Sequence, residues 1–249
     1  MKHFNSIILS ISLFFSGCSV AIADYFYQPL EQNESGMTAQ TYHEVRAYFM
    51  KAYNADVKTQ LGRILLVQDQ WESPYFLAYS ELNPHFAAIT VSGGIARTAH
   101  GSPALLATIL CHELGHLLGG APYQTIPHAE WASSEGTADH YAASKCLPKV
   151  YFDQPQWFSE VTLSRAECGD SLECSFIYNM GMSFLVFLQR YSYRPNVPVQ
   201  FELWEDPTDQ THLNSYPSDQ CRLDIFKQSG QCLRDSTKCN YISCWYVEN

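Results

Sequence analysis

Apolar residues recur along the first third of the chain with two different periods. From a capping residue at Thr38 to about Gln60 the spacing is helical, with apolar side chains at Tyr42, Val45, Phe49, Ala52 and Tyr53. Three short apolar runs follow at residues 64–67, 75–82 and 86–91, and each is typical of a β-strand. The third run is either an ordinary buried strand or an edge strand, which could pair with the main chain of a substrate.

Helices dominate the structure expected after residue 100. Ser102 and Pro103 favour a helix start, and the residues up to Leu118 are apolar on most sides, so this helix is expected to be buried. A Gly-Gly pair and Pro122 end it. Further helices are predicted over about residues 131–145, 156–165 and 176–193, with a loop at residues 121–129 and a last short helix near residues 221–224.

The N-terminus has the pattern of an export signal. A basic start at Lys2 precedes a short apolar stretch at residues 7–15, and Ala21-Ile22-Ala23 matches a cleavage site. A competing motif, Phe15-Ser16-Gly17-Cys18, is typical of bacterial lipoproteins and would place a lipid anchor on Cys18. We therefore expect a signal peptide over residues 1–23, a single domain over residues 24–249 and no later transmembrane segment. The expected location is periplasmic or secreted, or the outer membrane if Cys18 is lipidated.

Composition narrows the class of protein and of partner. The chain has 249 residues, of which 46% are hydrophobic and 16% charged, so it is globular and not disordered. Its formal net charge is −10, which argues against nucleic acid and anionic membrane surfaces as partners.

Cysteine usage supports export. The chain has nine cysteines, and removal of Cys18 with the signal peptide would leave eight, an even number that favours disulfides in an exported protein. Eight cysteines allow 105 full pairings. We expect only two individual disulfides, Cys168 with Cys174 and Cys111 with Cys146. The last four cysteines are expected to cross-link a C-terminal tail that has little core of its own.

The buried helix carries the motif His112-Glu113-x-x-His116. Two histidines four residues apart project from one helix face, at a separation that suits two nitrogen ligands of Zn²⁺. Glu113 is placed to reach a water molecule instead of the metal. The motif therefore predicts a catalytic zinc site, which needs a third protein ligand.

The third ligand has three candidate positions in the sequence. In the arrangement that places this ligand six residues after the second histidine, the position holds Pro122, which cannot bind a metal. In the other, a glutamate comes from the next helix, and Glu135 lies 135 − 116 = 19 residues past His116. Asp139 follows four residues later and is expected to accept the other ring N–H of a ligating histidine. Glu130 is a rival ligand, but it has no acid four residues later.

The motifs His112-Glu113-x-x-His116 and Glu135-x-x-Ala138-Asp139 resemble those of the gluzincin peptidases, specifically the family of HtpX and the CaaX prenyl protease. Tyr216-Pro217…Arg222-Leu223 is similar to a downstream His-Pro…Arg-Ile segment of that family, with tyrosine in place of its histidine. The resemblance covers roughly residues 80–225. It implies an α+β gluzincin (zincin-like) fold, with a small mixed sheet packed on the active-site helix and a mainly helical remainder. The best-known members have transmembrane helices, whereas none is expected in this chain after its signal peptide. The chain therefore looks more like the exported, soluble or lipid-anchored bacterial branch of that family.

The expected activity is that of a zinc-dependent endopeptidase acting on protein or peptide substrates. Glu113 is the expected general base, and the candidates for stabilising the oxyanion are Tyr216, His212 and Arg222. Arg222 has an alternative role as the ion-pair partner of Asp139 or Glu113. The loop at residues 121–129 is a candidate lid over the cleft. The alternative function is that of a non-catalytic, zinc-stabilised interaction protein of the cell envelope.

Overall fold

The computed structural model describes residues 27–159, 168–191, 198–200, 202–239 and 244–247. The predicted signal peptide and Cys18 lie outside these ranges. None of the helices within them combines the length and apolar character needed to cross a bilayer.

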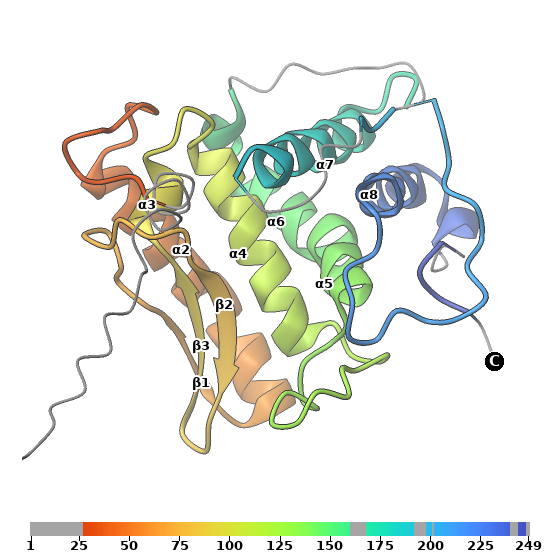
Figure 1. Ribbon diagram of the computed structural model, residues 1–249, viewed down its shortest axis with the longest axis horizontal. Helices are drawn as coiled ribbons and strands as arrows, with labels where there is room; N and C mark the ends of the chain where they lie inside the picture. Colours follow the sequence, from red (N-terminus) through yellow and green to blue (C-terminus); the bar gives the residue numbers. More distant parts are fainter. Residues whose placement is uncertain (1–26, 160–167, 192–197, 201, 240–243, 248–249) are drawn as a thin grey trace, which may run out of the picture.

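A three-stranded mixed sheet forms one side of the molecule (Figure 1). The central strand β3 (Phe86–Val91) pairs in parallel with β1 (Ile64–Val67) and antiparallel with β2 (Ala78–Leu82). Of the two alternatives for residues 86–91, the buried central strand is therefore correct, and β1 and β2 are the two edge strands. The predicted strand at residues 75–82 begins later than expected, because Tyr75 forms only an isolated bridge with Tyr27.

Two helices cover the sheet, and both begin as the sequence predicts. Helix α2 (Ala39–Leu61) starts at Thr38, whose side chain accepts a hydrogen bond from the main-chain N of Thr41. The short helix α3 (Gly93–Ala96) then leads to α4 (Pro103–Leu118), which is capped by Ser102. Every residue of α4 except Pro103 is buried, because the helix lies between the sheet and the remaining helices (Figure 1).

The second helix of the metal motif differs from its predicted range of residues 131–145. Helix α5 (Glu135–Tyr141) starts four residues later, because main-chain bonding holds the preceding residues: Ser133 N donates to His116 O and Ser134 N to Pro122 O. It continues through a π-helical turn (Ala142–Cys146) into α6 (Leu147–Asp153). The predicted helix at residues 156–165 is a short 3₁₀ turn (Pro155–Phe158) where it is described, and residues 160–167 lie outside the described ranges.

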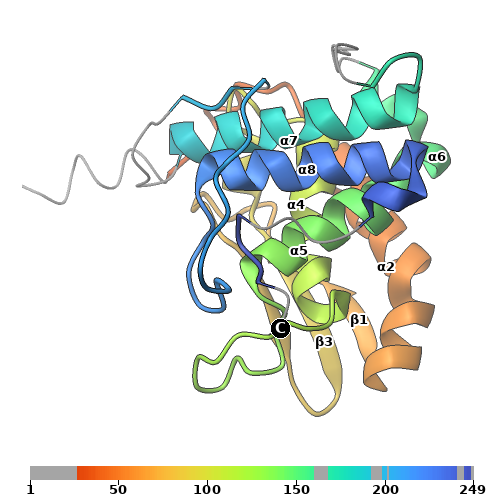
Figure 2. The same ribbon diagram turned by 90° about the vertical axis from the view of Figure 1, so that its right-hand side faces the viewer.

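The C-terminal third is more helical than expected. Helix α7 (Leu172–Tyr191) starts before the predicted residue 176, and α8 (Asp219–Arg234) replaces the predicted short helix. The two helices lie side by side in both views (Figures 1 and 2). The cysteine-rich tail has only a small cluster of its own, which consists of Cys221, Ile225, Cys244 and Trp245, whereas Phe226 of α8 is buried in the main hydrophobic core. A 3₁₀ turn (Ser236–Lys238) follows α8.

Four disulfides join the eight described cysteines. Cys111–Cys146 links α4 to the π-helical turn and Cys168–Cys174 closes a short loop, as the sequence predicts. The other two pairs, Cys221–Cys244 and Cys232–Cys239, tie the C-terminal segment to α8. The Cys111–Cys146 disulfide braces α4 one residue before His112.

Candidate metal centre

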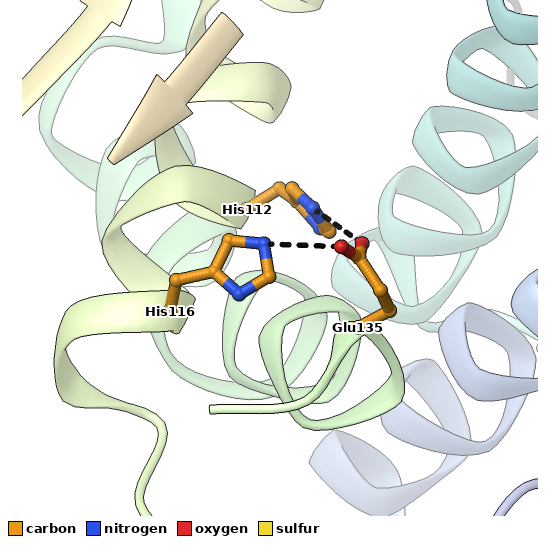
Figure 3. A group of neighbouring side chains, drawn as sticks. All are labelled: His112, His116 and Glu135. Carbon is orange, nitrogen blue, oxygen red and sulfur yellow. Dashed lines mark ion pairs between the residues drawn. The ribbon is translucent and has the colours of Figure 1, made fainter. Parts of the chain in front are cut away.

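Three buried side chains converge where α4 meets the start of α5. One ligand atom from each of His112, His116 and Glu135 lies within 4.8 Å of the other two. Figure 3 shows both imidazoles pointing at the Glu135 carboxylate, with His112 Nε2 3.2 Å from Oε2 and His116 Nε2 3.6 Å from Oε1. No other group of three such side chains converges in the described part of the chain.

A glycine between the two histidines allows the helices to meet. A Cβ atom on Gly115 would lie 2.5 Å from the main-chain O of Ala138, so any larger residue there would push α5 away from α4. This close approach brings Glu135, the first residue of α5, to the face of α4 that carries both histidines.

The hydrogen bonds behind the histidines decide which ring nitrogens face the centre. His112 Nδ1 lies 2.8 Å from Asp139 Oδ1, and His116 Nδ1 lies 2.8 Å from the main-chain O of Ser133. Both partners are acceptors, so each Nδ1 carries the hydrogen and each neutral ring presents an Nε2 lone pair. With both rings in this neutral form, two lone pairs face a carboxylate, and the buried Glu135 Oε2 accepts no hydrogen bond. A divalent cation between these atoms would satisfy all three, so the donor set fits a zinc-type ion.

Without a metal, the charges of the site hold a proton on His112. Burial by itself lowers the pKa of His112, but the Asp139 and Glu135 carboxylates more than offset this and raise it to about 10. For Glu135, burial raises the pKa, whereas the bond to His112 and the charge of His116 bring it down to about 2. The carboxylate is therefore ionised at neutral pH, and a metal ion must displace a proton from His112.

Arg222 of α8 supports Asp139 from behind. Its Nε and Nη2 atoms donate to Asp139 Oδ2 and Oδ1 at 2.6 and 2.8 Å, and both side chains are buried. Burial raises the pKa of the Asp139 carboxyl, but Arg222 and then His112 hold it below its usual range. Arg222 was predicted either to stabilise the oxyanion or to form an ion pair. The structure places it as the ion-pair partner of Asp139, and it does not line the pocket.

Glu113 is held at the pocket by a residue that sequence reasoning did not find. Ser80 Oγ of β2 lies 2.9 Å from Glu113 Oε2 and 2.6 Å from the main-chain O of Glu113. Nothing in the sequence around this single serine marks it as a partner of Glu113. Only the register of the sheet, which sets β2 along the edge beside α4, brings Ser80 to this carboxylate.

A pocket of about 200 Å³ opens at the centre. Its walls come from β2, α4, the loop before α5, Glu135 and the segment before α8, and they comprise Ala78, Tyr79, Ser80, His112, Glu113, His116, Gln124, Ala129, Trp131, Ala132, Glu135 and Tyr216. Of the candidates for oxyanion stabilisation, only Tyr216 lies in these walls. His212 lies elsewhere, with its Nδ1 3.0 Å from Ser215 Oγ. The rival ligand Glu130 is exposed and outside the ligand group.

The candidate lid at residues 121–129 borders this pocket through Gln124 and Ala129. It is tied to the segment that carries Tyr216: Thr125 N donates to Asn214 Oδ1 at 2.7 Å, and Asn214 Nδ2 donates to Thr125 Oγ1 at 2.6 Å. These two hydrogen bonds join the two loops beside the pocket.

None of the protein-family models, curated proteins or solved structures compared with the chain matches it. The likeness to gluzincin peptidases therefore rests on the motifs, and function must be argued from the chemistry of the site.

Proposed function

We propose that this protein is a zinc-dependent endopeptidase of the gluzincin type, resembling the family of HtpX and the CaaX prenyl protease. The observation that carries the proposal is that two Nε2 lone pairs and the ionised Glu135 carboxylate converge, with the carboxylate of Glu113 beside them in the same pocket. A purely structural metal site has no need of Glu113, whereas a hydrolytic site requires a base within reach of the water.

His112, His116 and Glu135 would hold the zinc ion. Asp139 and the main-chain O of Ser133 keep both imidazoles in the ligating tautomer. A bound zinc ion supplies a water of lowered pKa and polarises the carbonyl of the scissile bond. Glu113 accepts the proton of the attacking water and returns it to the leaving amine.

Other wall residues orient the substrate and the charge that develops on it. Tyr216 is the best placed of the three candidates to donate a hydrogen bond to the oxyanion, because its side chain lines the pocket. The edge of β2 that faces away from β3 bears no strand among the described residues. An extended polypeptide can add to such an edge through main-chain hydrogen bonds, which require no particular side chains.

Four disulfides support a location outside the reducing cytoplasm. We therefore propose that the enzyme acts in the cell envelope or outside the cell. The competing alternative to cleavage after Ala23, a lipid anchor on Cys18, would be detected by labelling with a fatty-acid analogue.

The test uses the oxidised, mature chain. Bound zinc is measured by elemental mass spectrometry, and cleavage is followed on an unfolded protein. Glu113→Gln should bind one zinc ion per chain and lose about 10²–10⁴-fold in activity, the usual contribution of a general base. Glu135→Ala should lose zinc, whereas Glu130→Ala, the matched change at the exposed rival ligand, should keep both zinc and activity.

Two results would contradict the proposal. Cleavage that survives Glu113→Gln would exclude this mechanism. Stoichiometric zinc without any cleavage by the wild-type chain would favour the alternative, a zinc-stabilised interaction protein of the envelope.

A further inference from the structure

A second cavity, larger than the pocket at the metal centre, lies at the opposite end of α4. Its volume is about 660 Å³, within the range typical of ligand sites, roughly 300–1,000 Å³. Its walls come from the segments around the starts of α2 and α4, from the 3₁₀ turn before residue 160 and from the middle of α7 (Figure 1). None of its wall residues lines the pocket at the metal centre, so the two cavities are separate.

The walls of this cavity carry no fixed charge. None of the wall residues is Asp, Glu, Lys or Arg, although these four types make up 16% of the chain. The only titratable side chain in the walls is that of His100. A charged ligand would lose water on entry without gaining a side chain of fixed opposite charge, so a neutral ligand is favoured.

The helix starts in the walls have already used part of their capacity to bind an anion. Helices α2 and α4 both begin at the cavity, and the unpaired N–H groups of a helix start attract negative charge. The Thr41 N–H donates to Thr38 Oγ1, and the Leu105 N–H donates to Ser102 Oγ, at 3.1 Å each. Pro103, the first residue of α4, has no N–H to offer.

Uncharged polar side chains in the walls keep hydrogen-bonding capacity for a ligand. Within the described part of the chain, the side chains of His100, Ser159 and Ser183 form no hydrogen bond. Asn179 and Gln156 donate from their amide nitrogens to neighbouring oxygens, which leaves both amide oxygens as acceptors. The walls therefore offer both donors and acceptors. A ligand rich in hydroxyl groups matches this mixture, because each hydroxyl can donate and accept.

An aromatic ring and three thioethers form much of the apolar part of the walls. Trp157 is half-buried, and its ring is held by an edge contact with Tyr48, with ring centroids 5.3 Å apart. Met37, Met180 and Met182 are three of the five methionines of the chain, and such flexible side chains adapt to the shape of a ligand. A sugar ring presents C–H groups on its faces and hydroxyls around its rim, so it fits both kinds of wall.

We propose that this cavity binds a neutral carbohydrate, with Trp157 packed against a sugar ring and Ser183, Asn179 and Gln156 bonded to its hydroxyls. The cavity is larger than one sugar ring needs, so the ligand class is an oligosaccharide, either free or as part of a larger glycan. Because this cavity and the metal centre share no residues, the inference does not depend on the proposed peptidase activity.

The test measures binding by isothermal titration of the oxidised, mature chain. The ligands are three neutral trisaccharides: cellotriose, maltotriose and chitotriose. We expect saturable binding of at least one of them, with a dissociation constant of about 1 mM or below. Glucose and glucose 6-phosphate are compared as a matched pair that differs by one phosphate group, and the phosphate should not improve binding.

Two pairs of variants assign the binding to this cavity. Trp157→Ala should weaken it about tenfold or more through lost apolar contact, whereas Phe152→Ala, at an α6 residue that is 86% exposed and outside the cavity, should not. Ser183→Ala should weaken it about 2–10-fold, the contribution of one hydrogen bond, whereas Ser236→Ala, at an exposed serine outside the cavity, should not. Since Ser183 is exposed, its replacement tests the site even if Trp157→Ala fails to fold.

The source of the carbohydrate is distinguished by sedimentation with insoluble cellulose, starch or chitin. Co-sedimentation of the wild-type chain would sustain the inference and identify a polymeric glycan as the ligand. Binding of a soluble trisaccharide without co-sedimentation would also sustain it and identify a free oligosaccharide.

Three results would overturn the inference. The first is the absence of saturable binding for all three trisaccharides, and the second is wild-type affinity in both Trp157→Ala and Ser183→Ala. The third is tighter binding of glucose 6-phosphate than of glucose, which would make the cavity an anion site formed by the helix starts. Carbohydrate binding by a chain that cleaves no protein would sustain this inference and overturn the proposed peptidase activity.

Discussion

Arg222 binds both oxygens of Asp139, at 2.6 and 2.8 Å, and Asp139 in turn binds His112 Nδ1 at 2.8 Å. The three side chains come from α8, α5 and α4, so the orientation of one candidate ligand depends on helices that are distant in sequence. The Phe184 ring lies 5.1 Å from the Arg222 guanidinium and stacks beneath it. This arrangement leaves the Asp139 carboxylate fully buried with its charge compensated.

Loss of the Arg222 guanidinium should affect both stability and metal binding. In Arg222→Gln, Asp139 is left as a buried charge without a cation, which costs about 3–5 kcal/mol of unfolding free energy. Zinc affinity should fall by about 10–100-fold, because Asp139 no longer orients His112. Chemical denaturation and competition with a zinc chelator measure the two effects. As a control, Lys149→Gln breaks the exposed pair with Asp153 and should cost less than about 1 kcal/mol. Unchanged zinc affinity in Arg222→Gln would contradict the positioning role.

Ser80 should affect turnover and not metal binding. Ser80→Ala removes the hydroxyl that lies 2.9 Å from Glu113 Oε2, so the carboxylate is less well oriented. The single hydroxyl hydrogen is shared with the main-chain O of Glu113, which lies 2.6 Å away, so the bond to the carboxylate contributes about 0.5–1.5 kcal/mol. We therefore expect kcat to fall by about 2–10-fold, with zinc content and KM nearly unchanged. Ser80→Thr keeps the hydroxyl and should retain most of the activity. Equal losses in Ser80→Ala and Ser80→Thr would argue for a packing effect instead.

The buried side chain of His140 should make the folded protein less stable as the pH falls below neutral. Burial lowers its pKa from the usual 6.5 or so to about 4, and Lys145 adds to the effect. Because the unfolded chain takes up a proton at higher pH than the folded one, His140 contributes its full stability above about pH 6.5. That stability is lost as the pH falls from about 6.5 toward 4, and the loss is about 2 kcal/mol between pH 7 and 5.

Urea denaturation of the metal-free protein at several pH values tests this expectation. His140→Gln should flatten the stability curve between pH 7 and 5, whereas His85→Gln, at an exposed histidine, should leave it as in the wild type. A curve for His140→Gln that is parallel to that of the wild type would show that another group causes the acid loss.

The C-terminal segment should be coupled to the start of α5. Trp245 is fully buried, and a Cβ atom on Gly136, the residue after the candidate ligand Glu135, would lie 2.3 Å from its ring. Gly136→Ala should therefore cost about 1–3 kcal/mol through overpacking. In the Trp245→Leu background the same change should cost less, and a double-mutant cycle on unfolding free energies measures the coupling. Additive effects would mean that the ring does not confine Gly136.

Several local features of this fold could be predicted from the sequence, because short-range chemistry decides them. Strands at residues 64–67 and 86–91 have the predicted bounds, and Thr38 and Ser102 cap α2 and α4 as expected. The candidate ligand group His112, His116 and Glu135 was also predicted from the sequence, two members by their helical spacing and the third by the E-x-x-x-D pattern. Pro122 excluded the competing geometry by its chemistry alone.

Tertiary structure decided what spacing cannot encode. The start of α5 at Glu135 depends on hydrogen bonds from Ser133 and Ser134 to residues near the end of α4, which propensity does not register. Which strand lies at the edge depends on pairing between strands, and that pairing places Ser80 beside Glu113. The choice between Tyr216, His212 and Arg222 depends on how α8 and its preceding segment pack. The sequence by itself thus determined the pairing of His112 and His116 on one helix face, since local periodicity relates them, and it singled out Glu135 as their partner. Packing of distant elements decided that Glu135 meets the two histidines, and it also decided the support of Glu113, the pocket walls and the role of Arg222.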